Sequence, residues 1–217
     1  MKNFIIEKNR GIVSEHFLDK NIADFDSACT YISALPYKRN KDKSNILCVF
    51  HELGGTCSTK HAVVRKLAFE NGRTETKLML GIFKMDLEYT GKIKNTLNKF
   101  GLKYIPEAHN YLKIEDVYFD HTRPSSDYND FKNKLLIEKE IEYNEIVEEK
   151  ILYHKNFLEK WIAAESIPYS LNEIWNIREQ CIQDLQEKDH IEFENSSPVC
   201  YHNSPEVRDD FQDETHH

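Results

Sequence analysis

The chain has 217 residues, of which 40% are hydrophobic and 12% aromatic, enough for one domain with a sizeable core. Its formal net charge of −8 is concentrated in residues 187–217, where nine acidic residues face only Lys188 and Arg208, a net charge of −7. The nearly neutral remainder argues against a nucleic-acid-binding protein, which needs a basic face. The longest apolar runs, such as 46–50, are too short to span a membrane.

The N-terminal sequence MKNFIIEKNRG has a short apolar run that soon meets a charge, unlike a secretory signal peptide. The chain has five cysteines, and none of them forms a C-x-x-C pair. Free thiols in a reducing compartment are the default for such a sequence. We therefore expect a cytoplasmic protein that has no membrane partner.

In the first third of the chain, residues 22–35 place apolar side chains at helical spacing. The basic loop 38–43 is interpreted as solvated, and the apolar run 46–50 is predicted to be a short strand or a buried segment. A further amphipathic helix begins near Thr56 or Cys57 and ends at the Asn71-Gly72 stop signal.

In the middle of the chain, alternating apolar residues over 77–86 predict a strand. Residues 90–101 are typical of a short helix that a glycine closes. Residues 107–122 predict a β-hairpin whose two-residue turn is Glu115-Asp116. These elements together favour an α+β fold with an antiparallel sheet.

The last third of the chain is expected to be helical. Residues 131–164 are rich in Glu and Lys with interspersed apolar residues, and a second helix follows Pro168. The acidic residues 187–217 lack periodicity, so we predict a poorly ordered tail. The expected organisation is a core domain over 1–130, a helical extension over 131–186 and the tail over 187–217.

A chemically distinctive feature is the thiol of Cys57 at the start of the helix. Backbone N–H groups at a helix N-terminus are unsatisfied and favour a thiolate over a thiol. Gly54 and Gly55 permit close approach of a substrate, and the N–H of Cys57 itself can donate to an oxyanion. A lone cysteine on a helix is more often structural. The hypothesis that Cys57 is a nucleophile therefore needs a nearby base.

The hairpin supplies a base and a group to orient it. With Glu115-Asp116 as the turn, His109 and Tyr111 share a face with Asp120, and diagonal Cβ atoms on such a face lie roughly 7–8 Å apart. A carboxylate can reach an imidazole across that gap. A register slip of one residue would separate His109 from Asp120.

Three other histidines compete for a role. His61 lies one helical turn after Cys57 and could touch the thiol, although nothing in the sequence orients it. His121 is expected on the opposite face of the hairpin from Asp120. His51 could line the site as a hydrogen-bond donor.

The segments GGTCSTKHAVVRKLAFENG and EAHNYLKIEDVYFDHT resemble the transglutaminase-like superfamily of the papain-like cysteine protease fold, over residues of about 45–123. The resemblance implies that Cys57 is the nucleophile, His109 the base and Asp120 the orienting group. The aromatic residue that often follows the histidine in this family is absent, and no upstream oxyanion side chain matches. We expect the site to be lined by His51, Gly55, Thr56 and Tyr111.

The expected function is therefore cysteine-dependent acyl transfer on a peptide or small amide, through a thioester and without a cofactor. Peptidases, amidases, deamidases and transamidases share these parts. Two alternatives stay open at this point. One is a non-catalytic binding module on the same fold, and the other is a metal site formed by Cys57, His61, His109 and Asp120.

Overall fold

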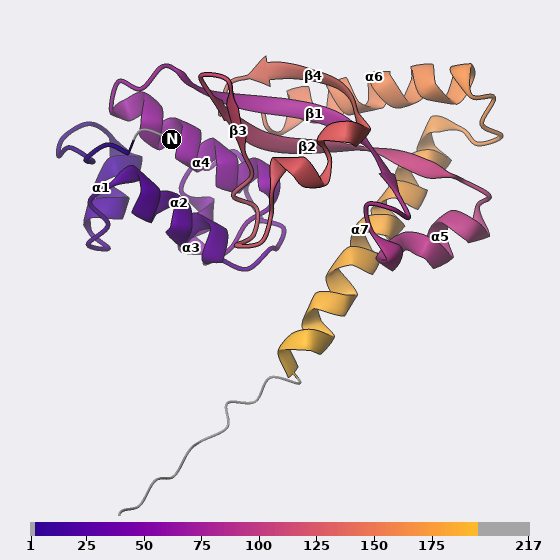
Figure 1. Ribbon diagram of the computed structural model, residues 1–217, viewed down its shortest axis with the longest axis horizontal. Helices are drawn as coiled ribbons and strands as arrows, with labels where there is room; N and C mark the ends of the chain where they lie inside the picture. Colours follow the sequence, from indigo (N-terminus) through magenta and orange to yellow (C-terminus); the bar gives the residue numbers. More distant parts are fainter. Residues whose placement is uncertain (1–2, 195–217) are drawn as a thin grey trace, which may run out of the picture.

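The fold is α+β, with a four-stranded antiparallel sheet in the order β3-β2-β1-β4 (Figure 1). The computed structural model describes residues 3–194, and describes side chains as far as residue 185. The strands are β1 (Thr76–Asp86), β2 (Tyr104–Ile114), β3 (Val117–Phe119) and β4 (Leu135–Ile141).

Helices cover the sheet in two groups. The first group is α1 (Ile12–Leu18), α2 (Phe25–Ala34), α3 (Cys48–His51) and α4 (Cys57–Glu70). The second group is α5 (Lys94–Lys99), α6 (Glu148–Ala164) and α7 (Leu171–Glu194). In the view of Figure 1 the two groups lie at opposite ends of the molecule, with the sheet between them. No helix in the described part of the chain is long and apolar enough to cross a membrane.

Alternation along β1 divides the core into two apolar clusters. Leu78, Leu80 and Ile82 belong to a cluster with the first group of helices. Met79 and Phe83 belong to a second cluster with α5, α6 and α7. Because successive side chains of a strand point to opposite faces, β1 is buried on both sides and joins the two halves of the core.

Several predicted elements are confirmed. The helix that was expected near Thr56 or Cys57 is α4, which begins at Cys57 and is followed by Asn71 and Gly72. The strand over 77–86 is β1, and α5 lies within 90–101. The hairpin has the predicted register, since Ile114 pairs with Val117 across the turn.

Other predictions are wrong in part. The run 46–50 contributes to the short helix α3 instead of a strand, although its last residues are buried as expected. Within the stretch predicted to be helical, residues 135–141 form β4, which pairs with β1. An edge strand with one half-exposed face can carry many Glu and Lys residues, and pairing with β1 decides its conformation. β4 therefore joins part of the expected extension to the sheet.

Two further differences concern the ends of the chain. Helix α1 was not anticipated from the sequence. Helix α7 continues to Glu194, so the segment 187–194 is helical and the predicted tail is shorter at its start. The rest of that predicted tail, residues 195–217, lies outside the described residues.

Candidate active site

Cys57 is the first residue of α4, and the loop before it fixes its position. The hydroxyl of Thr59 accepts a hydrogen bond from the backbone N–H of Thr56 at 3.0 Å, which closes the first turn. A Cβ atom on Gly55 would lie 2.6 Å from Thr59 Oγ1 and 2.8 Å from Val49 Cγ1. The glycine before Thr56-Cys57 is therefore needed for close packing, and it brings the buried thiol to the end of the helix.

The hairpin places His109 against Asp120. Nε2 of His109 lies 2.8 Å from Oδ2 of Asp120, and the other carboxylate oxygen accepts a hydrogen bond from the N–H of Thr122 at 2.8 Å. Asp120 follows the last residue of β3, so a short β-strand and a backbone contact together orient its side chain. The rings of Tyr111 and Phe131 pack beside the imidazole and hold it in place.

The thiol of Cys57 also interacts with His109, and each group stabilises the charged form of the other. Because Nε2 faces Asp120, Nδ1 is the nitrogen left for the sulfur. The three residues that were predicted as nucleophile, base and orienting group thus lie next to one another, with His109 between Cys57 and Asp120.

Lys150 of α6 also reaches the thiol. Its ammonium lies 3.8 Å from Cys57 Sγ and donates hydrogen bonds to Ser58 Oγ at 2.9 Å and Asn110 Oδ1 at 2.8 Å. Ser58 in turn donates to Asn110 at 3.0 Å. The three groups form a polar network that holds a positive charge beside the sulfur.

These charges change the ionisation of the thiol and the imidazole. Burial alone would raise the pKa of Cys57, but Lys150 and His109 outweigh that effect and lower it to about 6. Burial alone would lower the pKa of His109, but the charges of Asp120 and Cys57 raise it to about 10. Near neutral pH the pair is therefore a thiolate beside an imidazolium.

His61 has a structural role beneath this pair. Its Nδ1 lies 2.7 Å from the carbonyl oxygen of Cys57, and its Nε2 accepts a hydrogen bond from the N–H of His121 at 2.8 Å. Burial lowers the pKa of His61 to about 3, so the ring is neutral and its tautomer is fixed. It ties the start of α4 to the end of the hairpin.

The arrangement of His61 also bears on the metal alternative. Both of its ring nitrogens are engaged by backbone groups, so His61 cannot ligate a metal together with Cys57. Among the residues that the structure describes, no group of three or more His, Cys, Asp and Glu side chains is arranged to hold a metal ion.

A buried lysine ties the hairpin to the first group of helices. Lys60 of α4 donates to the carbonyl oxygens of Leu35 and Thr122, the latter at 2.7 Å. Burial lowers the pKa of Lys60 to about 8. Because Thr122 lies two residues after Asp120, this lysine contributes to positioning the carboxylate.

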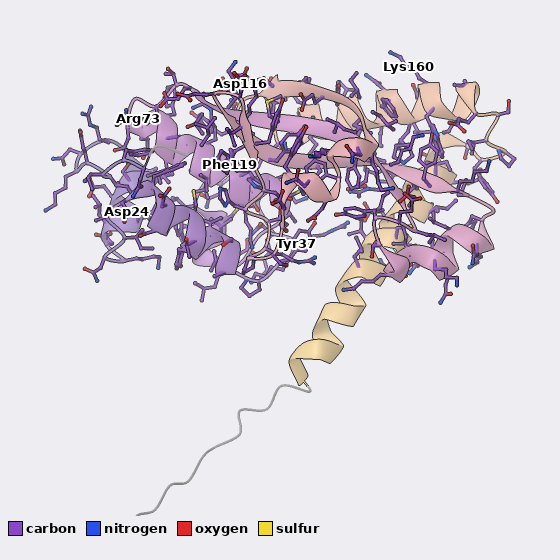
Figure 2. All side chains as sticks on the ribbon, in the orientation of Figure 1. Asp24, Tyr37, Arg73, Asp116, Phe119 and Lys160 are labelled. Atoms are coloured by element: carbon purple, nitrogen blue, oxygen red, sulfur yellow. The ribbon has the colours of Figure 1, made fainter. Side chains whose placement is uncertain are left out.

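A cleft of about 400 Å³ opens beside the thiol. One side consists of Tyr37 and the loop that follows it, together with the Thr56–Ser58 turn, and the other consists of α6 and α7. Figure 2 labels Tyr37 below the sheet, between the first group of helices and α7. Arg178 of α7 closes the cleft through a two-pronged ion pair with Glu107 of β2, in which Nε lies 2.6 Å from Oε2.

The structure separates the four residues that were expected to line the site. Thr56 lines the cleft, and Gly55 packs behind it. His51 lies on the exposed end of α3 beside His16 and does not reach the cleft. Tyr111 is fully buried, and its hydroxyl donates to Glu138, so it supports His109 from behind instead of lining the cleft.

Sequence reasoning missed the contributions of α6 and α7. Lys150 and Arg178 stand in charge-rich amphipathic helices, where basic residues usually face solvent. Their distance along the chain from Cys57 leaves no local pattern that would have identified them. Tyr37 stands in the loop between α2 and α3, and no pattern in the sequence marks it as part of the site.

Comparison with known protein families, curated proteins and solved structures gives no match to this chain.

Proposed function

We propose that the protein catalyses cysteine-dependent acyl transfer on amide bonds, and that its core is a distant variant of the transglutaminase-like, papain-like arrangement. The observation that carries the proposal is the chain of contacts from Cys57 through His109 to Asp120, at the start of a helix and beside a cleft. A nucleophile, a base and an orienting group in this order are the parts that acyl transfer needs.

The steps follow from the ionisation of these groups. The thiolate of Cys57 attacks the carbonyl carbon and forms a C–S bond, and the carbonyl electrons move to oxygen. The imidazolium of His109 then gives its proton to the leaving amine as the C–N bond breaks. Water or a second amine then gives a proton to His109 and attacks the thioester. The C–S bond breaks, and the thiolate beside the imidazolium is restored.

The oxyanion needs hydrogen-bond donors in the cleft. The backbone N–H of Cys57 is one, because the first residues of a helix lack an intrahelical acceptor. The hydroxyl of Tyr37 is proposed as the second. Burial and the negative charge of Cys57 raise the pKa of Tyr37, so the phenol keeps its proton and can donate it in a hydrogen bond.

The test is to trap the acyl-enzyme. Purified protein is incubated with a library of peptides and small amides and quenched in acid, and its intact mass is measured. We expect a mass increase on Cys57 that hydroxylamine removes and that Cys57→Ala lacks. A binding module on the same fold would retain ligands without any such covalent adduct.

A further inference from the structure

The cleft beside Cys57 has more positive than negative side chains. Its basic residues are Arg39, Lys43, Lys150 and Arg178, and its acidic residues are Glu107 and Glu179. A low-dielectric cleft that is lined mainly by one sign of charge attracts ligands of the other sign.

The two carboxylates are already occupied. Glu107 accepts both prongs of the Arg178 guanidinium, and Glu179 contacts Arg178 and Arg39, each at 2.5 Å. The acidic groups of the cleft therefore neutralise its arginines and leave the two lysines without a carboxylate partner.

The two lysines differ in their contacts. Lys150 is committed to the polar network of Ser58, Asn110 and the thiolate. For Lys43, no hydrogen bond and no carboxylate within ion-pair distance is found among residues 3–185. Its side chain is nonetheless half-buried, and burial together with the charges of Lys150 and Arg39 lowers its pKa.

A second polar group lies beside the cleft. Thr56 is 8% exposed and lines the cleft next to Cys57, and its hydroxyl faces the backbone N–H of Thr59 in the capping box of α4. The walls around these groups are apolar and are formed by Ile146, Val147, Ile151 and Trp175. A ligand that fits this cleft offers an apolar portion and a negative charge near Lys43.

We infer that the acyl-transfer substrate carries an anionic group, a carboxylate or a phosphate, on the portion that lies in this cleft, with Lys43 as its partner. The inference rests on the proposed function for the reaction, but the charge preference is a property of the cleft. Most of the basic loop 38–43 is exposed as expected, and Arg39 and Lys43 in addition line the cleft.

The experiment compares two alkylating agents of similar size, iodoacetate and iodoacetamide, on Cys57 in the full-length protein. The ratio of their rates, read by mass spectrometry, reports anion attraction by the cleft. We expect Lys43→Met to lower the iodoacetate-to-iodoacetamide ratio roughly two- to fivefold and Lys43→Glu to lower it further. Lys41 is an exposed neighbour of Lys43 that does not line the cleft. Lys41→Met is therefore the control, and it should leave the ratio unchanged.

A second arm identifies the anion. Glutarate and inorganic phosphate, at equal ionic strength, are tested for protection of Cys57 against iodoacetamide. Protection that depends on Lys43 supports a carboxylate if glutarate gives it and a phosphate if phosphate gives it. The inference is overturned if Lys43→Met leaves the rate ratio unchanged, or if neither anion protects.

Failure of this inference is distinguishable from failure of the proposed function. Alkylation needs only the thiolate and the surrounding charges, and it does not need turnover. A protein that forms no acyl-enzyme but shows the Lys43-dependent ratio keeps the anion site and loses the acyl-transfer proposal. A protein that forms the acyl-enzyme but shows an unchanged ratio keeps the acyl-transfer proposal and loses the anion site.

Discussion

The two sides of the candidate site are built in different ways. On the side of α4, β2 and β3, the reacting groups are carried by elements whose sequence patterns are evident, and short-range geometry brings His109 and Asp120 together. On the side of α6 and α7, Lys150 and Arg178 arrive from a distant part of the chain through packing of the second apolar cluster.

This difference separates the two contributions to the chemistry. In the proposed reaction, the first side provides the nucleophile, the proton carrier and the orienting carboxylate. The second side provides the positive charge beside the thiol and one wall of the cleft. Substitutions on the first side should therefore remove the reaction, and substitutions on the second side should change ionisation, stability and substrate choice.

The largest effect is expected for Asp120→Asn on the first side. The amide fits the same space but cannot stabilise the imidazolium, and it favours the wrong tautomer of His109. In a comparable triad this change lowers turnover by about 10⁴-fold. The rate of acyl-enzyme formation measures it, with circular dichroism to show that the fold is kept.

His121→Ala is the matched control for Asp120→Asn, because the hydrogen bond from His121 to His61 comes from the backbone N–H, which alanine keeps. It should cost little activity. Full activity in Asp120→Asn together with loss of activity in His121→Ala would show that Asp120 is not the orienting group.

Next in size is the effect of Arg178→Met on stability. The change leaves the carboxylate of Glu107 buried without its cation, and breaking a buried ion pair in this way costs about 3–5 kcal/mol of unfolding free energy. Urea denaturation measures it. The exposed pair of Lys77 and Glu140 gives the comparison, since Lys77→Met should cost no more than about 1 kcal/mol. Equal losses would mean that Arg178 does not fasten α7 to β2.

Removal of one hydroxyl tests the oxyanion proposal. Tyr37→Phe keeps the ring and deletes the donor, so acylation should slow by about 10²–10³-fold, while the alkylation rate of Cys57 stays close to that of the native protein. The control is Tyr31→Phe, which alters a tyrosine of the first apolar cluster, away from the cleft. A native acylation rate in Tyr37→Phe would remove Tyr37 from the mechanism.

The smallest change is a shift in pH dependence. A cation close to the sulfur favours the thiolate, so Lys150→Met should raise the pKa of Cys57 from about 6 by roughly one to three units. The pH profile of Cys57 alkylation measures the shift, since its lower limb moves toward higher pH. Lys160→Met is the control, because Lys160 is exposed farther along the same helix, as Figure 2 shows. An unmoved limb in Lys150→Met would show that α6 does not activate the thiol.

Much of the first side was predictable from the sequence for a physical reason. The Glu115-Asp116 turn sets the register of the hairpin, and the register alone brings residue 109 near residue 120. Helix α4 has a glycine-led start and an Asn-Gly end, and both are local signals. By contrast, residues 135–141 could not be recognised as a strand from the sequence. Their Glu and Lys residues are compatible with a helix or an edge strand, and only pairing with β1 selects the strand.

The ionisation states of Cys57 and His109 also could not be predicted from the sequence. A thiol buried at a helix start gains a low pKa only if cations outweigh the cost of burial, and that depends on Lys150, which no spacing rule links to Cys57. The orientation of His61 depends on two backbone contacts that exist only in the folded chain.

The central claim is that the surroundings of Cys57 activate it as a nucleophile. Burial is the main reason why the pKa values of the other described cysteines are raised, to about 11 for Cys48 and about 12 for Cys181. The pKa of Cys29 is raised as well. Brief alkylation with iodoacetamide at about pH 7, followed by peptide mass spectrometry, compares all the thiols of one sample. We predict that Cys57 is labelled first and that Cys29, Cys48 and Cys181 are labelled only after unfolding. Labelling of any of these three ahead of Cys57 would contradict the account.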